Sequence, residues 1–255
     1  LEGQFDYVFF PGCALLTFAP EVTKETYDLL NSKFGNVGLF SKCCGRPLEE
    51  LGLVEESSEN TSFLGSDLDR IGSPKIITSC PLCFHTLKRN LVDYQIYSVY
   101  ELLKERPFRL KVSGKVAIHD SCPFRYYPDQ LNAVRDIFNL NNVDIIELEL
   151  STAKTVCCGA GGGIALVSSE ISQGLSESVI NDAKERGVRT LVTYCETCAL
   201  TLTPIASKHG IKLLHVLNLI TGHEPNYLDV FQKVQSLFTG PNMVRSLERL
   251  GLSER

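Results

Sequence analysis

The sequence predicts an α/β fold built from two tandem, pseudo-symmetric βαβ-type repeats with parallel sheets. Short apolar segments of strand length alternate with helical segments along most of the chain, and this alternation is typical of βαβ units. The ten cysteines also fall into two copies of one pattern: a lone Cys, then Cys-Cys-Gly, then Cys-x-x-Cys. A duplicated unit therefore explains both the order of the segments and every cysteine.

Each repeat is expected to contain four strands, with a cysteine motif after each of the first three. In the first repeat, residues 5–110, the expected strands are 7–10, 37–40, 75–78 and 96–99, and the expected helices are 20–34, 51–71 and 84–90. In the second repeat, residues 111–222, the expected strands are 116–118, 144–148, 190–193 and 212–216, and the expected helices are 129–138, 168–186 and 199–209. Residues 223–255 are expected to form a tail that packs on the repeats or binds a partner, with helices at 228–238 and 243–250.

The cysteine motifs predict two metal centres. The first copy consists of Cys13, Cys43, Cys44, Cys80 and Cys83, and the second of Cys122, Cys157, Cys158, Cys195 and Cys198. All follow strand ends, where parallel sheets bind their ligands. Thiolates bind zinc, copper(I) and iron–sulfur clusters. Because a tetrahedral zinc needs only four ligands, five thiolates per copy favour a larger or irregular cluster.

Glycines at the Cys-Cys pairs are the next candidates for the site. Neighbouring cysteines can share one centre only if the chain turns sharply, and Gly45 and Gly159 supply that freedom directly after each pair. In the second copy, further glycines can bring backbone N–H groups close to an anionic cluster or ligand: Gly161, Gly162 and Gly163. The first copy has Arg46-Pro47 instead. We therefore expect two non-equivalent centres and a more open second pocket.

Composition excludes several classes of protein. The apolar fraction of 44% can form a core, so a disulfide scaffold in an exported protein is disfavoured and a reducing, cytoplasmic compartment is expected. The net charge of −5, without a basic run, disfavours nucleic-acid binding. No segment has the roughly 18 to 20 apolar residues of a membrane span. The start lacks Met and a signal peptide, as expected at the edge of a larger polypeptide.

The motifs resemble the cysteine-rich CCG domain in tandem, over residues 5 to 222. The matching segments are Phe10-Pro11-Gly12-Cys13, His119-Asp120-Ser121-Cys122 and residues 157–163. This family includes the CCG-containing component of heterodisulfide reductase and iron–sulfur subunits of glycolate, lactate and glycerol phosphate oxidation systems. The resemblance implies two non-cubane [4Fe-4S] clusters, each bound by five cysteines, with zinc as an alternative in one site. Ser121 and Glu196 depart from the usual residues of the family. Many relatives have an N-terminal ferredoxin domain, and these 255 residues lack the ferredoxin run C-x₂-C-x₂-C.

The resemblance implies an iron–sulfur redox subunit of the heterodisulfide reductase type. A disulfide is then cleaved at the clusters, each sulfur being captured by an iron and then protonated, with Cys157, Cys158 and His119 as catalytic residues. One alternative is an electron-relay subunit of a flavin-dependent 2-hydroxy acid or glycerol phosphate dehydrogenase. Another is a zinc-binding structural module. Thiol–disulfide exchange through the two Cys-x-x-Cys pairs would leave six cysteines without a role.

The sequence contains no flavin or nicotinamide fingerprint, so a partner must supply electrons. We expect a flavin or ferredoxin-type iron–sulfur subunit as partner, and a small disulfide or another electron acceptor as substrate. His119 is expected to donate to a cluster sulfur, deliver a proton or cap a helix, and His85 to play a structural part. Arg46 and Arg125 flank the motifs and either balance cluster charge, bind an anionic substrate or remain solvated. Structural parts are expected for His209, His215 and His223.

Overall fold

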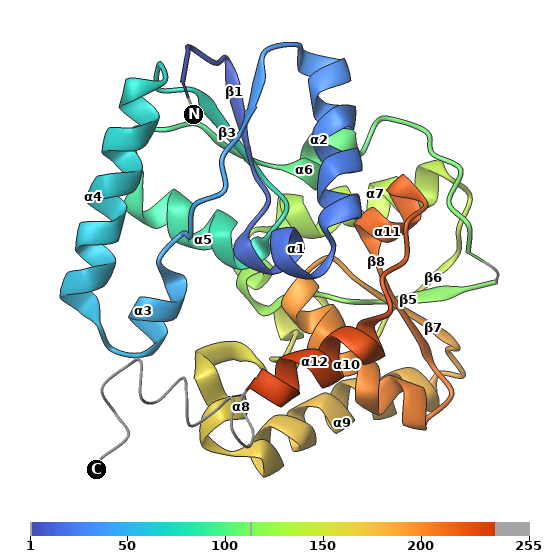
Figure 1. Cartoon of the computed structure of the whole chain (residues 1–255). Coiled ribbons are helices and arrows are strands. Elements are labelled where there is room, and N and C mark those ends of the chain that lie inside the picture. Colours follow the sequence, from blue (N-terminus) through green and yellow to red (C-terminus); the bar gives the residue numbers. More distant parts are fainter. Residues whose placement is uncertain (1, 113, 238–255) are drawn as a thin grey trace, which may run out of the picture.

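The computed structural model describes residues 2–112 and 114–237, which form two four-stranded, all-parallel sheets with helices packed around them (Figure 1). The strands of the first sheet are β1 (Tyr7–Phe10), β2 (Val37–Leu39), β3 (Lys75–Thr78) and β4 (Ile96–Ser98), in the order β2-β1-β3-β4. Those of the second are β5 (Val116–His119), β6 (Ile145–Ile146), β7 (Thr190–Thr193) and β8 (Lys212–His215), in the order β6-β5-β7-β8. The predicted fold class, with two parallel-sheet repeats of one topology, is confirmed.

The helices of the first repeat are α1 (Cys13–Phe18), α2 (Pro20–Phe34), α3 (Arg46–Glu50), α4 (Val54–Arg70), α5 (Pro81–Asn90) and α6 (Val99–Leu103). The second repeat contains α7 (Pro128–Leu140), α8 (Ile164–Val167), α9 (Ser169–Glu185), α10 (Glu196–Lys208) and α11 (Val216–Thr221), with 3-10 turns η1 (Cys122–Tyr126), η2 (Thr152–Lys154) and η3 (Gly161–Gly163). Helix α12 (Tyr227–Leu237) follows. The helix expected at 243–250 lies outside the described residues, and the predicted repeat limits remain predictions.

The predicted starts of two helices, at residues 84 and 199, are wrong in a way that matters for the site. Helix α5 begins at Pro81 and α10 at Glu196, with Cys80 and Cys195 as extended N-cap residues. Proline is favoured in the first turn because its missing N–H is not needed there. Each Cys-x-x-Cys therefore spans a helix start, with its second cysteine in the first turn.

The sheet order places the cysteine motifs at one edge. In the first sheet the chain runs from β1 to β2 and then crosses to β3 on the other side of β1. The strand order reverses between β1 and β3, and such switch points open a crevice beyond the carboxyl ends of the strands. The lone cysteine follows β1 and the Cys-x-x-Cys follows β3. The second sheet repeats this arrangement with β5 and β7.

The two repeats share a core and pack with approximate two-fold symmetry. One cluster of buried side chains contains Phe9 and Ile76 from the first repeat and Ile118 and Val192 from the second. Helix α2 contacts α11 while α6 contacts α7, and α1 contacts α10 while α5 contacts η1. In each pair, the second contact joins the elements that are equivalent to those of the first contact, with the two repeats exchanged. The repeats therefore hold both motif-bearing edges against each other.

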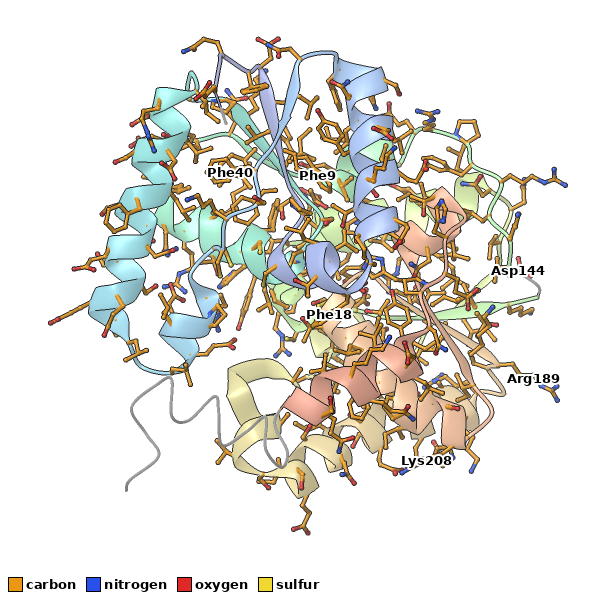
Figure 2. All side chains as sticks on the ribbon, in the orientation of Figure 1. Phe9, Phe18, Phe40, Asp144, Arg189 and Lys208 are labelled. Atoms are coloured by element: carbon orange, nitrogen blue, oxygen red, sulfur yellow. The ribbon has the colours of Figure 1, made fainter. Side chains whose placement is uncertain are left out.

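The side chains follow this division between core and rim. Phe9 and Phe40 lie inside the first repeat, whereas Asp144, Arg189 and Lys208 extend from the rim of the second (Figure 2). Fully buried Tyr100 lies at the seam, where its hydroxyl is 3.2 Å from the carbonyl of Ser79 and 2.9 Å from that of Tyr194. These two carbonyls end equivalent strands of the two repeats, so one hydroxyl joins both strand ends.

Candidate metal centres and substrate cavity

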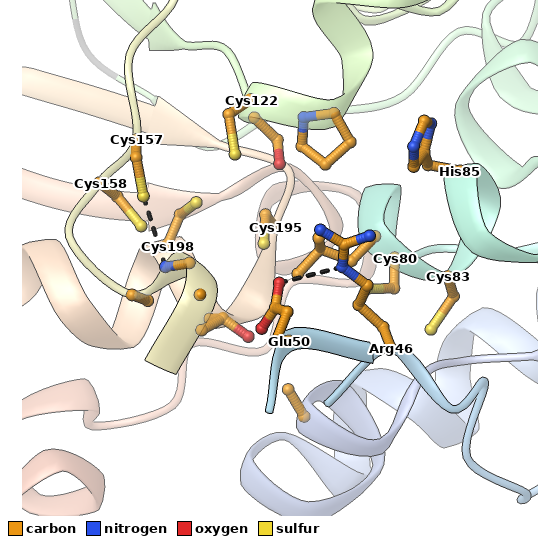
Figure 3. Close-up of a pocket in the computed structure, with 18 of the residues that line it drawn as sticks. Arg46, Glu50, Cys80, Cys83, His85, Cys122, Cys157, Cys158, Cys195 and Cys198 are labelled. Atoms are coloured by element: carbon orange, nitrogen blue, oxygen red, sulfur yellow. Dashed lines mark hydrogen bonds and ion pairs between the residues drawn. The ribbon is translucent and has the colours of Figure 1, made fainter. Parts of the chain in front are cut away.

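Both cysteine sets open onto one cavity of about 500 Å³ that lies between the two repeats (Figure 3). Every cysteine except Cys43 lines it. The remaining lining includes apolar side chains from both repeats, among them Leu82 and Pro123. The ten cysteines are all free thiols. The structure therefore brings together nearly all of the predicted ligands, and it does so around a shared space.

Within the first copy, the five thiols form a continuous chain of hydrogen-bond contacts. Cys13 and Cys44 both donate to Cys43, and Cys83 lies between Cys44 and Cys80. The two thiol donors and the backbone N–H of Gly45 lower the pKa of Cys43 far below that of a free thiol. This thiol is therefore ionised at neutral pH, as a metal ligand must be.

The second copy repeats the chain residue for residue. Cys122 and Cys158 donate to Cys157, and Cys198 lies between Cys158 and Cys195. The thiol donors and two backbone N–H groups lower the pKa of Cys157. The pKa of Cys195 is lowered to about 7, and the hydrogen bond with the thiol of Cys198 contributes most to this decrease. The two copies thus present the same geometry of donors.

The predicted glycines play different structural roles. Gly159 and Gly161 each donate a backbone N–H to Cys157 Sγ at 3.3 Å. Gly159 has φ of 103°, and a Cβ there would lie 2.3 Å from the carbonyl oxygen of Ser172, so no side chain fits. Gly45 has φ of 83° and caps α3. Gly161 and Gly162 line the cavity, whereas Gly163 is not among its lining residues.

The structure contradicts the expectation of a more open second pocket. The exposed thiols are Cys13 and Cys43, both in the first copy, whereas Cys158, Cys195 and Cys198 are buried. Gly161 and Gly162 of the glycine run line the shared cavity, and η3 packs against α3 of the first repeat. The second centre is the more enclosed of the two.

His119 lies at the end of β5, inside the second centre. It is fully buried, and neither ring nitrogen has a hydrogen-bond partner among the described residues. A ring nitrogen lies within 4.8 Å of the sulfurs of both Cys158 and Cys198. Burial lowers the pKa of His119 to about 4, so its imidazole is neutral. The hypothesis that His119 caps a helix is wrong, since Ser121 is the N-cap residue of η1.

Two arginines line the cavity in different electrostatic settings. Arg46 forms ion pairs with Glu49 at 3.1 Å and Glu50 at 3.0 Å, and its pair with Glu50 is drawn in Figure 3. Arg125 donates to the carbonyls of Cys122 and Thr155 and has no carboxylate within 4 Å in the described part of the chain. It is therefore a cation at the second centre that no acidic side chain neutralises.

The cavity also has an aromatic rim and a rigid support behind the second copy. His85 lies 3.1 Å from the hydroxyl of Tyr127 and stacks on Tyr126. Behind the second copy, fully buried Asp120 accepts two hydrogen bonds from Arg135, at 2.8 and 3.1 Å, and one from Tyr194 at 3.0 Å. Asp120 therefore fixes the loop that carries Cys122.

The structure adds contacts near the second copy that the sequence analysis did not predict. The hydroxyl of Ser121 donates to the thiol of Cys195. The sequence signal for this contact is that Ser121 departs from the residue usual in the family. Tyr227 of α12 donates to Glu196 Oε2 at 3.0 Å, and burial raises the pKa of Glu196 to about 8. No sequence signal connects Tyr227 to the motif. His215 caps α11, which agrees with the structural part expected for it.

These donor sets fit a thiolate-bound metal centre in each copy. Five thiols in mutual contact, one of them strongly acidified, provide the soft anionic ligands of an iron–sulfur cluster or zinc. The second copy adds a buried imidazole whose nitrogens have no protein partner among the described residues. Since buried polar groups are rarely left without a partner, these nitrogens indicate a bound group at this place.

Comparison with known proteins identifies the family. The model of the CCG cysteine-rich domain matches residues 7–88 and 116–203, so the chain belongs to this family. It is 24% identical over 80% of its length to one component of a dihydromethanophenazine:CoB–CoM heterodisulfide reductase of Methanosarcina barkeri, covering 54% of that protein. It is 28% identical over 82% of its length to an EtfAB:quinone oxidoreductase of Syntrophomonas wolfei, covering 32% of it.

An uncharacterized iron–sulfur protein of Methanococcus maripaludis is 24% identical over 84% of this chain and is covered over 45% of its length. The chain therefore spans about half of the first relative and less than half of the other two. These relatives place it among iron–sulfur proteins and components of oxidoreductases. No helix of the described residues is both long and apolar enough to cross a bilayer.

Proposed function

We propose that this chain is an iron–sulfur redox subunit of the heterodisulfide reductase type, with two cysteine-bound clusters serving one substrate cavity. The observation that carries the proposal is that thiols of both copies line the same cavity of about 500 Å³. A substrate in this cavity lies between the two centres. Five thiols per copy support non-cubane [4Fe-4S] clusters, and free thiols support a reducing, cytoplasmic compartment.

The reaction that fits this arrangement is the reduction of a small disulfide. The substrate R–S–S–R′ takes up two electrons and two protons, its S–S bond breaks, and two thiols leave. When bound, each cluster supplies electrons one at a time. The electrons come from a partner, either a flavin subunit or a ferredoxin-type iron–sulfur subunit, because the sequence has no flavin or nicotinamide motif of its own.

The residues of the second copy are assigned the catalytic part. Cys157 receives two backbone N–H donors, which stabilise negative charge on its sulfur. Cys158 lies between Cys157 and Cys198, and His119 lies beside both Cys158 and Cys198. Arg125 adds a positive charge that attracts an anionic substrate. Apolar residues such as Leu82 also line the cavity.

Electron relay to a quinone-like acceptor is the second candidate. The cavity has several apolar lining residues, among them Leu82 and Pro123, and a planar ring fits such a wall. The similarity to an EtfAB:quinone oxidoreductase supports this candidate. A zinc-binding structural module is less favoured, because a tetrahedral zinc leaves one thiol of each copy without a role.

Metal analysis of protein purified without oxygen tests the proposal. We expect about eight irons with matching acid-labile sulfide per chain, and a brown absorption spectrum. About two zinc ions without iron would overturn it in favour of the structural module. The loaded protein is then mixed with a reduced viologen dye and a small disulfide or a quinone. Dye oxidation with the appearance of thiols supports disulfide reduction, and dye oxidation by the quinone alone supports the relay.

A further inference from the structure

His119 distinguishes the second centre from the first. It ends β5 in the register position that Phe10 occupies at the end of β1, because Phe10 pairs with Thr78 and His119 pairs with Thr193. These partners end the equivalent strands β3 and β7. The first copy therefore has a phenyl ring where the second has an imidazole.

The imidazole of His119 lacks the partners that a buried histidine normally has. It is 0% exposed, and both of its nitrogens are without a hydrogen bond among the described residues. A buried polar group without a partner destabilises the folded state. His215 is a matched contrast: it is equally buried, yet its Nδ1 accepts a hydrogen bond from the N–H of Leu217 at 3.2 Å. Burial alone does not leave a histidine unpartnered in this fold.

The position of His119 supplies the missing partner. A ring nitrogen and the sulfurs of Cys158 and Cys198 all lie within 4.8 Å of one another. Ligands of this kind on one tetrahedral ion lie about 3.6 Å apart, given metal–nitrogen and metal–sulfur bonds of about 2.1 and 2.3 Å. The ring nitrogen and the two sulfurs therefore need to approach one another by only about 1 Å to bind the same metal ion. A ring nitrogen without a hydrogen-bond partner can offer its lone pair to a metal.

We propose that His119 is a ligand of the second centre, binding iron through a ring nitrogen beside Cys158 and Cys198. The first centre then has thiolate ligands alone, and the second has a mixed nitrogen–sulfur set. The proposal rests on the proposed function, since it takes the metal to be iron.

Pulsed EPR spectroscopy of anaerobically reduced protein containing ¹⁵N-labelled histidine tests this assignment. We expect nitrogen hyperfine coupling to a paramagnetic centre in the wild type. His119→Phe places in the second copy the residue that the first copy already has, and we expect it to abolish the coupling. His215→Asn retains a helix-capping side chain and removes the other buried imidazole, and we expect it to leave the coupling unchanged.

Several outcomes would overturn the assignment. Absence of coupling in iron-loaded wild type, or its persistence in His119→Phe, shows that the imidazole is not a ligand. If His119→Phe does not fold, His119→Cys keeps a metal-binding group and must lose only the nitrogen signal. Zinc in place of iron refutes the proposed function separately. X-ray absorption at the zinc edge then tests His119, with an imidazole contribution expected in wild type and lost in His119→Phe. A chain that takes up neither metal overturns both proposals.

Discussion

The two copies of the motif contain equivalent thiols that contact one another in the same order, but the surroundings of the thiols differ. The first copy has exposed Cys13 and Cys43, whereas the second buries three of its five thiols. Near the second centre lie His119 and Arg125, and at the matching positions of the first copy lie Phe10 and Leu16. Cys157 also accepts an N–H from Gly161.

This comparison separates the thiols proposed to bind a metal from the surroundings that would adjust its reduction potential. The ligand pattern is duplicated, so both copies have the capacity to hold a similar centre. The second copy adds a cation and an N–H donor, which favour a more reduced centre because they stabilise added negative charge, and it also adds an imidazole. We therefore infer a division of labour in which the first centre receives electrons and the second delivers them to the substrate.

The largest expected effect comes from removing one buried thiol of each Cys-Cys pair. Cys44→Ala and Cys158→Ala are matched, since both residues are almost fully buried and lie between two other thiols. We expect each variant to lose about half of its iron. With a reduced viologen dye that enters the cavity directly, Cys158→Ala is expected to abolish disulfide reduction and Cys44→Ala to retain part of it.

Metal analysis and the initial rate of dye oxidation check this prediction in the same preparations. Equal losses of activity in the two variants would contradict the assignment of catalysis to the second centre. Full activity of Cys158→Ala would remove the second centre from the reaction altogether.

The next largest effect concerns the support behind each centre. Asp120 is fully buried and bound by Arg135 and Tyr194. Without Asp120, the buried hydroxyl of Tyr194 loses its acceptor and Arg135 keeps only Glu147 as an acidic partner, and breaking a buried pair in this way costs up to about 3–5 kcal/mol. At the equivalent helix position of the first repeat, Tyr27 donates a single hydrogen bond to the carbonyl of Val37. Losing this bond costs about 0.5–1.5 kcal/mol.

Anaerobic urea unfolding of Asp120→Ala and Tyr27→Phe measures this difference in the free energy of unfolding. Glu147→Ala is the control, because Glu147 also pairs with Arg135 but is half exposed, and its pair contributes about 1 kcal/mol or less. If Asp120→Ala were no more destabilising than Glu147→Ala, the buried pair would not be the anchor of the second loop.

The sequence is sufficient to predict the fold class and the two groups of five cysteines, because both depend on local patterns that occur twice. The alternation of segments predicts the parallel sheets, and the spacing of the cysteines predicts two groups of five. The shared cavity is not predictable in this way, since it depends on how the repeats pack. The contact between η3 and α3 involves residues more than 100 positions apart. Tyr227 reaches Glu196 from a helix outside the repeat.

The smallest expected effect concerns the N-cap residues that follow the last strand of each repeat. The first repeat has Ser98 at this position and the second has His215. Burial lowers the pKa of His215 to about 3 in the folded protein, compared with about 6.5 in an unfolded chain. The unfolded state therefore binds the proton first, and stability is lost as the pH falls from about 6.5 towards 3. At pH 5 the loss from this residue is about 2 kcal/mol.

His215→Asn keeps a side chain that caps helices well and does not titrate in this range. We expect the decrease in the free energy of unfolding between pH 7 and pH 5 to be about 2 kcal/mol smaller in this variant than in the wild type. Urea unfolding at the two pH values measures both decreases, and effects of carboxylates or of metal loss cancel in their difference. Ser98→Asn, the matched change in the first repeat, is expected to leave the pH dependence unaltered, because neither side chain titrates. Equal decreases in wild type and His215→Asn would show that the acid sensitivity of the second repeat arises elsewhere.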